Sequence, residues 1–252
     1  MIDLHLHLLH GVDDGPVDLA QAVAMGQLAA ADGCAALIAT PHQRRDEWET
    51  ADVRRLEERL AAVADRLPGA PRLALGAEVR VDSDLLADLA SPGQAGILSL
   101  AGSRYLLLEL DPFGVGPEPV ELTRELIAEG WRPIYAHPEV IPFLWDDAGE
   151  LLPRLVEAGA LLQITAMSVT GEFGRGPRER AWELLEAGWA HFVASDAHRP
   201  DWRPPGLGRA RRAIEQELGS GLAQALTVDH PRAVLDDRPL PTLQAQRAEA
   251  GR

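Results

Sequence analysis

A cycle of four segments recurs about seven times along this chain, and it constrains the fold more than any other feature of the sequence. In each cycle an amphipathic stretch ends near a glycine, a short apolar run follows, and a polar motif comes directly after that run. Helical stretches that alternate with apolar runs are typical of βα units joined in a parallel sheet. We therefore expect an α/β fold whose sheet curves into a distorted (β/α) barrel, with functional groups at the carboxyl ends of the strands.

The apolar runs and the amphipathic stretches divide the chain into predicted strands and helices. The helix from about residue 52 shows the pattern clearly, because its apolar residues from Val53 to Leu67 recur every three or four positions and share one face. The predicted strands are 2–6, 35–40, 72–79, 104–110, 132–136, 160–165 and 191–195, and a polar loop is predicted at 41–50. The other predicted helices are 17–31, 82–89, 118–129, 151–158, 178–187, 207–218 and 221–226.

Length and composition limit the number of domains and the environment of the chain. With 252 residues, of which 46% are hydrophobic, and no break in composition before the end, we expect one domain over residues 1–238. Residues 239–252 are rich in Pro, Gln, Ala and Arg and are expected to form a flexible tail. Membrane insertion is not expected, since no stretch of about 18 apolar residues is present.

The ionisable residues exclude several kinds of site. The net charge of −15 disfavours a general electrostatic affinity for nucleic acid. All 24 basic residues are arginines, so a Schiff-base lysine, a P-loop lysine and a carbamylated lysine between two metals are impossible. Cys34 is the one cysteine, which excludes an internal disulfide. Together with an N-terminus that lacks a basic signal-peptide region, it predicts a cytoplasmic protein.

Histidines follow the predicted strands in short motifs. His5 and His7 lie two residues apart on the first strand, where alternate side chains point to the same face, so both imidazoles can reach one cation. The alternative is a pair of packed or surface histidines. His42 follows the second strand and His137 the fifth. Asp14 lies in the loop after the first strand, where Asp-Gly is ordinary turn chemistry, but its nearness to His5 and His7 favours a ligand role.

Two acidic residues lie within apolar predicted strands, where their side chains are expected to be buried. Glu78 closes the third predicted strand, and Glu109 lies inside the apolar fourth one, where a carboxylate is costly to bury without a cation or a donor. Imidazole and carboxylate ligands together suit Mn²⁺, Fe²⁺ or Zn²⁺. The candidates are too many for one ion, so two or three ions that lower the pKa of bound water are predicted. The candidate ligands are His5, His7, Asp14, His42, Glu78, Glu109, His137, Asp196 and His198.

The chain resembles the PHP (polymerase and histidinol phosphatase) superfamily over roughly residues 1–235. Seven segments carry the resemblance in this order and spacing: MIDLHLHLLHGVDDGP, IATPH, GAEVR, LLLEL, AHPE, LLQITAMSVTGEFG and HFVASDAH. Within it, they look most like the manganese-dependent tyrosine-protein phosphatases of bacterial capsule and exopolysaccharide gene clusters. The resemblance implies a distorted seven-stranded (β/α) barrel and attack of a metal-bound hydroxide on a phosphomonoester. The implied partner is an autophosphorylated tyrosine kinase that controls polysaccharide export.

The resemblance also implies three divalent ions, with Mn²⁺ as the expected metal, and it assigns ligands to each. Glu78 would bridge the first and the second ion. The first ion would be held by His5, His7, Glu78 and Asp196, the second by Glu78, Glu109 and His137, and the third by Asp14, His42 and His198.

Arginine is expected to hold the substrate phosphate, and here the sequence departs from the family pattern. The family reads His-Pro-Glu-Arg after the fifth strand, whereas this chain has Val140 in place of that arginine. A second family arginine is matched by Arg203, so Asp196, His198 and Arg203 are the predicted catalytic residues. A guanidinium binds phosphate through two parallel hydrogen bonds, so its loss bears on substrate choice more than on the metal site. The candidates to replace it are Arg80 and Arg199.

Other functions stay open at the level of the sequence. A PHP phosphoesterase for histidinol phosphate or a nucleotide would use the same metal site, and a metal-binding regulatory module would have lost turnover. An amidohydrolase also begins with His-x-His, but its usual bridging lysine cannot exist here. A cysteine-dependent tyrosine phosphatase needs an arginine six residues after its nucleophile. Here Thr40 stands six residues after Cys34, so Cys34 is predicted to be a small buried residue.

Overall fold

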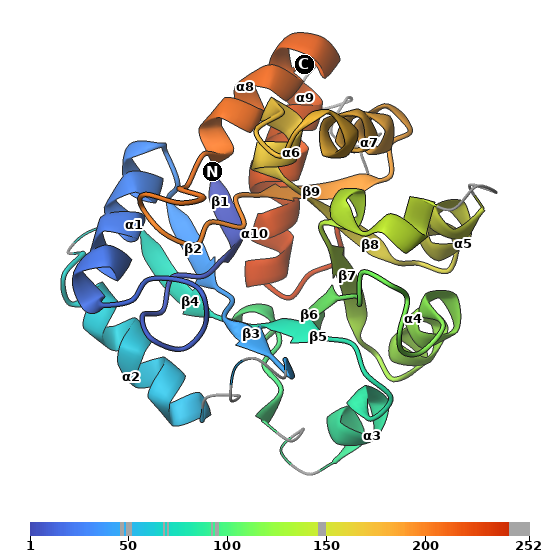
Figure 1. Cartoon of the computed structure of the whole chain (residues 1–252), viewed down its shortest axis with the longest axis horizontal. Coiled ribbons are helices and arrows are strands. Elements are labelled where there is room, and N and C mark those ends of the chain that lie inside the picture. The colour runs from blue at the N-terminus through green and yellow to red at the C-terminus, as the bar shows by residue number, and fades with distance from the viewer. Residues whose placement is uncertain are drawn as a thin grey trace.

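The strands lie at the centre of the molecule and helices surround them (Figure 1). The computed structural model describes residues 1–45, 48, 52–67, 69, 71–91, 93, 96–145 and 150–241. Most of the predicted tail, residues 242–252, and part of the predicted loop at 41–50 lie outside the described residues. Of the helices in the described ranges, none is both long and apolar enough to cross a bilayer.

The described strands pair in parallel and form two sheets, as expected of βα units. They are β1 Ile2–Leu6, β2 Ala36–Ala39, β3 His42–Gln43, β4 Arg72–Leu75, β5 Glu78–Arg80, β6 Tyr105–Glu109, β7 Arg132–Ala136, β8 Leu161–Thr165 and β9 Ala190–Ala194. The smaller sheet has the order β1-β2-β4, and the larger has the order β3-β5-β6-β7-β8-β9. The α/β class predicted from the sequence is therefore confirmed.

The prediction of one continuous strand over residues 72–79 is wrong, because β4 and β5 belong to different sheets. Gly76 lies between them, where a Cβ atom would come within 2.9 Å of Leu100 Cδ2 and 3.2 Å of Ile38 Cγ2. Glycine permits this close approach, and the chain passes there from one sheet to the other. Glu78 consequently opens β5 and pairs with His42 of β3, a short strand inside the predicted loop. Apolar periodicity does not register such a break, since both halves are apolar.

The first and last strands also lie side by side at their carboxyl ends. The Asp196 backbone N–H donates to the His5 carbonyl at 2.8 Å, and the His7 N–H donates to the Ala197 carbonyl at 2.8 Å. A parallel bridge joins Leu6 to Ala197 between these two bonds. The backbone thus holds the His-x-His motif against the motif that follows β9, although the sequence places them at opposite ends of the chain.

Glycines end three helices as the sequence predicts. Gly130, Gly159 and Gly188 come after the helices Pro119–Ala128, Leu151–Glu157 and Arg175–Glu186. Their φ angles are 89°, 100° and 71°, a left-handed conformation that glycine adopts without steric cost. The helices are α1 Leu19–Ala31, α2 Val53–Ala64, α3 Leu85–Ala90, α4 Pro119–Ala128, α5 Leu151–Glu157, α6 Ala166–Thr170, α7 Arg175–Glu186, α8 Leu207–Leu218, α9 Ser220–Gln224 and α10 His230–Leu235.

Some helix boundaries differ from the prediction for local reasons. The first helix begins at Leu19 instead of residue 17, because the Asp18 side chain accepts a hydrogen bond from the Gln21 N–H at 2.9 Å and so caps it. The third begins at Leu85 instead of residue 82. Two helices were not predicted. The first, α6, has only five residues, and α10 continues from a π-helical turn with Pro231 in its first turn.

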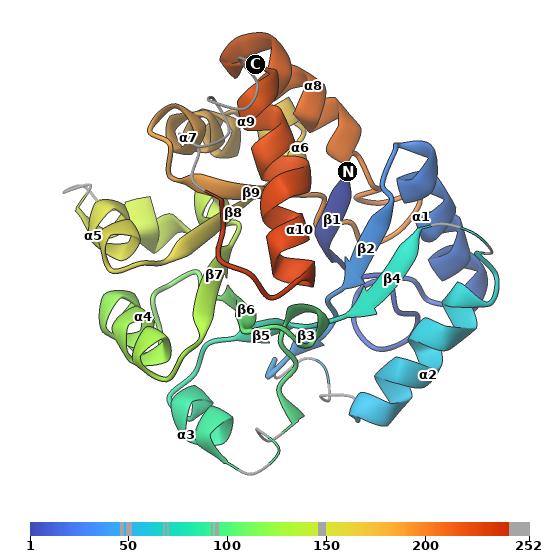
Figure 2. The same cartoon turned by 180° about the vertical axis from the view of Figure 1, so that it is seen from behind.

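The apolar side chains of the strands form two cores. The outer core lies between strands and helices, and the smaller inner core consists mainly of strand residues. Leu106 and Leu108 of β6 pack in the large cluster that also contains helix residues, whereas Tyr105 and Leu107 join a smaller cluster. That smaller cluster includes Val234 of α10, which crosses the face of the molecule seen from behind (Figure 2). Because side chains alternate along a strand, Glu109 continues the inner face at the carboxyl end of β6.

Replacement of Gly76 by alanine is expected to destabilise the fold by about 1–3 kcal/mol, because the added methyl group would overpack the contact with Leu100 and Ile38. The free energy of unfolding in urea measures the effect. Gly176→Ala in α7 is a suitable control, since a Cβ atom there meets nothing within 4 Å. Equal destabilisation by the two variants would contradict this account of the strand break.

Candidate metal centre

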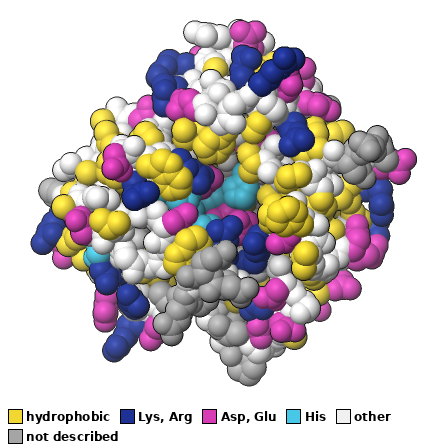
Figure 3. Space-filling view, viewed as in Figure 1, with side chains coloured by type: hydrophobic (Ala, Val, Ile, Leu, Met, Phe, Trp, Pro, Cys, Tyr) yellow, Lys and Arg dark blue, Asp and Glu magenta, His cyan; other side chains and the backbone are white. Residues whose placement is uncertain are grey.

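The nine predicted ligands lie together at the carboxyl ends of the strands, where histidines are visible in a hollow at the centre of Figure 3. Eight of the nine are buried. The exception is Asp14, whose side chain is 31% exposed. The hollow opens on the face of the molecule opposite α10 (Figures 2 and 3).

Potential ligand atoms in the described part of the chain fall into three groups, in each of which the atoms lie within 4.8 Å of one another. The groups are His7, Asp14, His42 and His198; His5, His7 and Asp196; and His42, Glu78 and Glu109. The first two resemble the predicted ligand sets for the third and first ions. In the third group His42 takes the place expected for His137, whose Nε2 lies 2.7 Å from Glu78 Oε1. The assignment of ligands to particular ions stays a prediction.

Glu78 is surrounded by imidazoles. One of its oxygens, Oε2, lies 2.9 Å from His42 Nδ1 and 3.5 Å from the Nε2 atoms of both His5 and His7. Burial raises the pKa of a carboxyl group, but His5, His42 and His137 together hold the pKa of Glu78 well below its ordinary value. Conversely, burial alone would lower the pKa of His137, and Glu78 raises it to about 9. The carboxylate at the centre of the cluster is therefore ionised.

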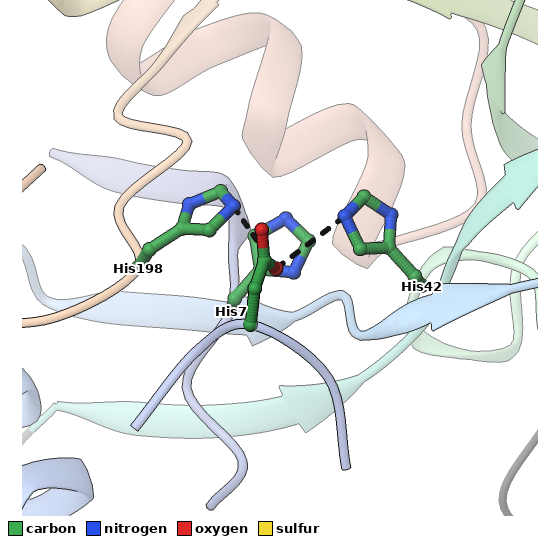
Figure 4. Close-up of side chains that lie close together, drawn as sticks. His7, His42 and His198 are labelled. Carbon is green, nitrogen blue, oxygen red and sulfur yellow. Dashed lines mark ion pairs between the residues drawn. The ribbon is translucent and has the colours of Figure 1, made fainter. Parts of the chain in front are cut away.

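Asp14 connects two histidines at the mouth of the hollow. Its Oδ1 lies 3.3 Å from His198 Nε2 and 3.6 Å from His42 Nε2. Figure 4 shows His7, His42 and His198 close together, with dashed lines for the ion pairs of His42 and His198. Partial burial opposes ionisation, but the three histidines lower the pKa of Asp14 to about 2. Asp14 is thus a charged and partly exposed carboxylate.

Two residues that the sequence analysis did not select orient the His-x-His pair. His5 Nδ1 lies 2.8 Å from Gln163 Oε1, and His7 Nδ1 lies 2.8 Å from Asp13 Oδ2. Each contact places the ring proton on Nδ1 and leaves Nε2 free to bind a cation, an arrangement common around metal-binding histidines. Asp13 also accepts a hydrogen bond from the His42 N–H at 3.1 Å. Its position beside Asp14 was the available signal, whereas nothing in the sequence marked Gln163.

Several buried atoms of the centre form no hydrogen bond of normal geometry with the described residues, although two of them, His42 Nδ1 and Glu78 Oε2, lie 2.9 Å apart. Leaving buried polar atoms unpaired is costly, and native structures contain few of them. A divalent cation would satisfy all of them, and the mixture of imidazole and carboxylate donors is one that Mn²⁺, Fe²⁺ and Zn²⁺ accept. The residues present therefore fit bound divalent cations. These atoms of the candidate ligands are His5 Nε2, His7 Nε2, His42 Nδ1, His137 Nδ1, Asp14 Oδ1 and Glu78 Oε2.

The backbone is strained at the centre. His137 and Asp196, which follow β7 and β9, have φ angles of 38° and 51°, and Arg44 and Arg203 have φ angles of 66° and 56°. Left-handed conformations cost non-glycine residues of the order of 1–3 kcal/mol and gather at functional sites. The strain turns the chain sharply at the strand ends, so that side chains following β7 and β9 point into the hollow.

The three arginines predicted to bind phosphate make different contacts near the centre. Arg203 pairs with Asp196, and its Nη1 lies 3.3 Å from His198 Nε2. Arg80 donates to the Leu110 carbonyl at 3.2 Å and lies 3.8 Å from Glu109, whereas Arg199 lies over the Trp202 ring. Arg45, which no motif in the sequence marks, donates two hydrogen bonds to Glu109.

Cys34 takes no part in the centre. It precedes β2 and so lies at the amino end of that strand, whereas the candidate ligands gather at the carboxyl ends. It is buried, and burial together with the negative charge of Asp3 raises the pKa of its thiol far above the ordinary value. Such a thiol is a poor nucleophile, which agrees with the prediction that Cys34 is a packing residue.

Known proteins are similar to this chain over most of its length. The sequence profile of the family described as capsular polysaccharide synthesis, CpsB/CapC, matches residues 1–236. The tyrosine-protein phosphatase YwqE of Bacillus subtilis (strain 168) is 36% identical over 232 residues, which are 90% of this chain and 89% of YwqE. The tyrosine-protein phosphatase CpsB of Streptococcus pneumoniae is 29% identical over 245 residues, which are 94% of this chain and 99% of CpsB.

Solved structures agree with the sequence comparison. A crystal structure from work on YwqE of Bacillus subtilis and CpsB of Streptococcus pneumoniae, described as unique metal-dependent tyrosine phosphatases, matches with a TM-score of 0.88 and 32% identity. The match covers 96% of each chain. A phosphotriesterase from Mycobacterium tuberculosis matches with a TM-score of 0.58 at 15% identity over 94% of this chain and 93% of its own, which shows likeness of fold alone. The resemblance predicted from the sequence motifs is confirmed, and the chain belongs to the CpsB/CapC family of capsular polysaccharide synthesis.

Proposed function

We propose that this protein is a metal-dependent protein-tyrosine phosphatase. The observation that carries the proposal is the convergence of buried imidazole and carboxylate atoms that lack hydrogen-bond partners among the described residues. Family membership supports it, because YwqE and CpsB are named tyrosine-protein phosphatases. The substrate we infer is a phosphotyrosine protein, and the partner is an autophosphorylated tyrosine kinase of polysaccharide export.

The proposal includes the fold and the ions that the motifs imply. Two observations support a distorted seven-stranded barrel, namely the passage of two chain segments from one sheet to the other and the backbone bonds between β1 and the end of β9. We propose three divalent ions, because nine ligands are too many for one ion, and Mn²⁺ is the proposed metal. These ligands are His5, His7, Asp14, His42, Glu78, Glu109, His137, Asp196 and His198.

Each part of the centre has a proposed task. Bound divalent ions would lower the pKa of a water molecule and neutralise negative charge on the phosphoryl group. Arg203 binds a phosphate oxygen, because its guanidinium lies beside His198 and can form two parallel hydrogen bonds with an oxyanion. Gln163 and Asp13 keep the Nε2 atoms of His5 and His7 directed at the centre.

Hydrolysis of p-nitrophenyl phosphate is expected to increase with added Mn²⁺ and to be lost after chelation. His5→Ala and Asp196→Ala should each reduce the rate to background, because each removes a side chain that faces the centre. Cys34→Ser should retain the wild-type rate. Initial rates are measured after the metal content and the fold of each variant have been checked.

Two outcomes would contradict this mechanism. A folded but inactive Cys34→Ser protein would show that the thiol takes part in the reaction. Fully metallated wild-type protein without turnover would leave a metal-binding regulatory module as the remaining function.

Asp13→Asn is expected to weaken Mn²⁺ binding by about 10–100-fold, because the amide no longer offers His7 a negatively charged acceptor. The dissociation constant is measured by competition with a fluorescent chelator. Asp65→Asn on the exposed end of α2 removes the same charge far from any ligand contact and should bind as wild type. Equal affinity in all three proteins would refute a role for Asp13 in orienting His7.

A phosphotyrosine peptide is expected to have a kcat/KM about tenfold above that of histidinol phosphate, because aromatic contacts add roughly 0.5–1.5 kcal/mol. Trp202, which is 46% exposed, and Phe173 both lie within 6 Å of the Arg203 guanidinium and offer such contacts. The same peptide with phosphoserine is the matched control. A higher kcat/KM for histidinol phosphate would favour a small-molecule phosphatase, a function that Val140 in place of arginine keeps open.

A further inference from the structure

Arg45 reaches into the metal centre from the loop after β3. Its Nε donates to Glu109 Oε2 at 2.8 Å and its Nη2 donates to Glu109 Oε1 at 2.6 Å, so the two planar groups meet in a bidentate pair. The third guanidinium nitrogen, Nη1, lies 3.4 Å from His42 Nε2. The side chain is 21% exposed, which places the guanidinium at the boundary between the buried ligands and solvent.

The neighbouring arginine fixes the direction of this loop. Arg44 has a left-handed backbone with a φ of 66°, and its side chain binds Asp82 at 2.9 Å and Asp88 at 2.6 Å, near α3. Burial would lower the pKa of Arg44, but the two carboxylates outweigh it and raise that pKa. Arg44 therefore ties the chain directly after β3 to Asp82 and Asp88, and the left-handed turn at Arg44 directs the next side chain, Arg45, toward Glu109.

Arg45 and Arg203 have similar surroundings on two sides of the centre. Arg45 lies 5.4 Å from the centroid of the Trp48 ring, which stacks on His42 at 4.9 Å. Arg203 lies 5.6 Å from the centroid of the Trp202 ring, which contacts His198 edge-on at 5.5 Å. Each guanidinium also pairs with a candidate metal-binding carboxylate, Glu109 for Arg45 and Asp196 for Arg203.

Accepting the proposed function, we propose that Arg45 binds the substrate phosphate together with Arg203 and supplies the cation that is absent at Val140. If Glu109 held a divalent cation, it would offer that cation the same carboxylate oxygens to which Arg45 donates here. The Arg45 guanidinium would then have N–H donors available for the oxygens of the substrate phosphate. Its planar, forked arrangement of donors matches the geometry of a phosphate group. Arg45 suits this task better than Arg80, which donates to the Leu110 carbonyl and lies 3.6 Å from Asp111.

Calorimetric titration of the Mn²⁺-loaded protein with inorganic phosphate tests the proposal without turnover. Arg45→Ala is expected to weaken phosphate binding by about 10–100-fold, the usual effect of losing a charge-assisted bidentate contact. Arg45→Lys should recover only part of this loss, because an ammonium lacks the planar fork. Arg54→Ala on α2, whose side chain is 81% exposed, removes the same charge and should leave phosphate binding unchanged.

The affinity for Mn²⁺ and the steady-state rates separate phosphate binding from a structural role. Removal of Arg45 should leave Mn²⁺ affinity equal or higher, since a competing cation is gone, and KM for a phosphotyrosine peptide should rise more than kcat falls. Phosphate affinity in Arg45→Ala within twofold of wild type would refute the proposal, as would a loss of Mn²⁺ affinity that accounts for the phosphate effect. Absence of turnover in wild-type protein that still binds phosphate would refute the proposed function and leave the role of Arg45 intact.

Discussion

The candidate metal centre depends on the contacts between the buried carboxylate of Glu78 and the histidines around it. An ionised carboxylate is costly to bury unless opposite charge surrounds it. Here His42 and His137 contact it at 2.9 and 2.7 Å, and His5 and His7 approach within 3.5 Å. These residues lie on β1, β3 and β5 or directly after β1 and β7. Four chain segments are thus tied at their carboxyl ends by one charge that none of them would bury alone.

The backbone brings these side chains together through conformations that cost free energy locally. Gly76 allows the chain to pass between sheets, and the pairing of His42 with Glu78 across β3 and β5 follows from that shift. His137 and Asp196 adopt left-handed backbones that turn their side chains into the hollow. Such strain persists only when the surrounding structure over-determines it. The hydrogen bonds between β1 and the end of β9 give that support for Asp196.

The candidate metal ligands and the arginines proposed to bind phosphate differ in how the fold holds them. The candidate ligands lie on or just after strands that the core fixes, and Gln163 and Asp13 orient two of them. The arginines instead lie on loops with left-handed backbones at Arg44 and Arg203, next to exposed or stacked tryptophans. A loop can exchange one arginine position for another without disturbing the strands. If Arg45 binds phosphate as proposed, this difference explains how the chain can carry all nine candidate ligands together with valine at position 140.

The sequence by itself determined the α/β class, most strands and the nine candidate ligands, because hydrophobic periodicity and the residue types that bind metal are local properties of the chain. It did not reveal the break at Gly76, the helices α6 and α10, or the contacts of Gln163 and Arg45. Those features depend on which residues meet across the fold. Gln163 lies 158 residues from His5, and Arg45 lies 64 residues from Glu109. Periodicity shows which face of a strand is buried, but only the tertiary structure decides which side chain from another strand or loop meets it there.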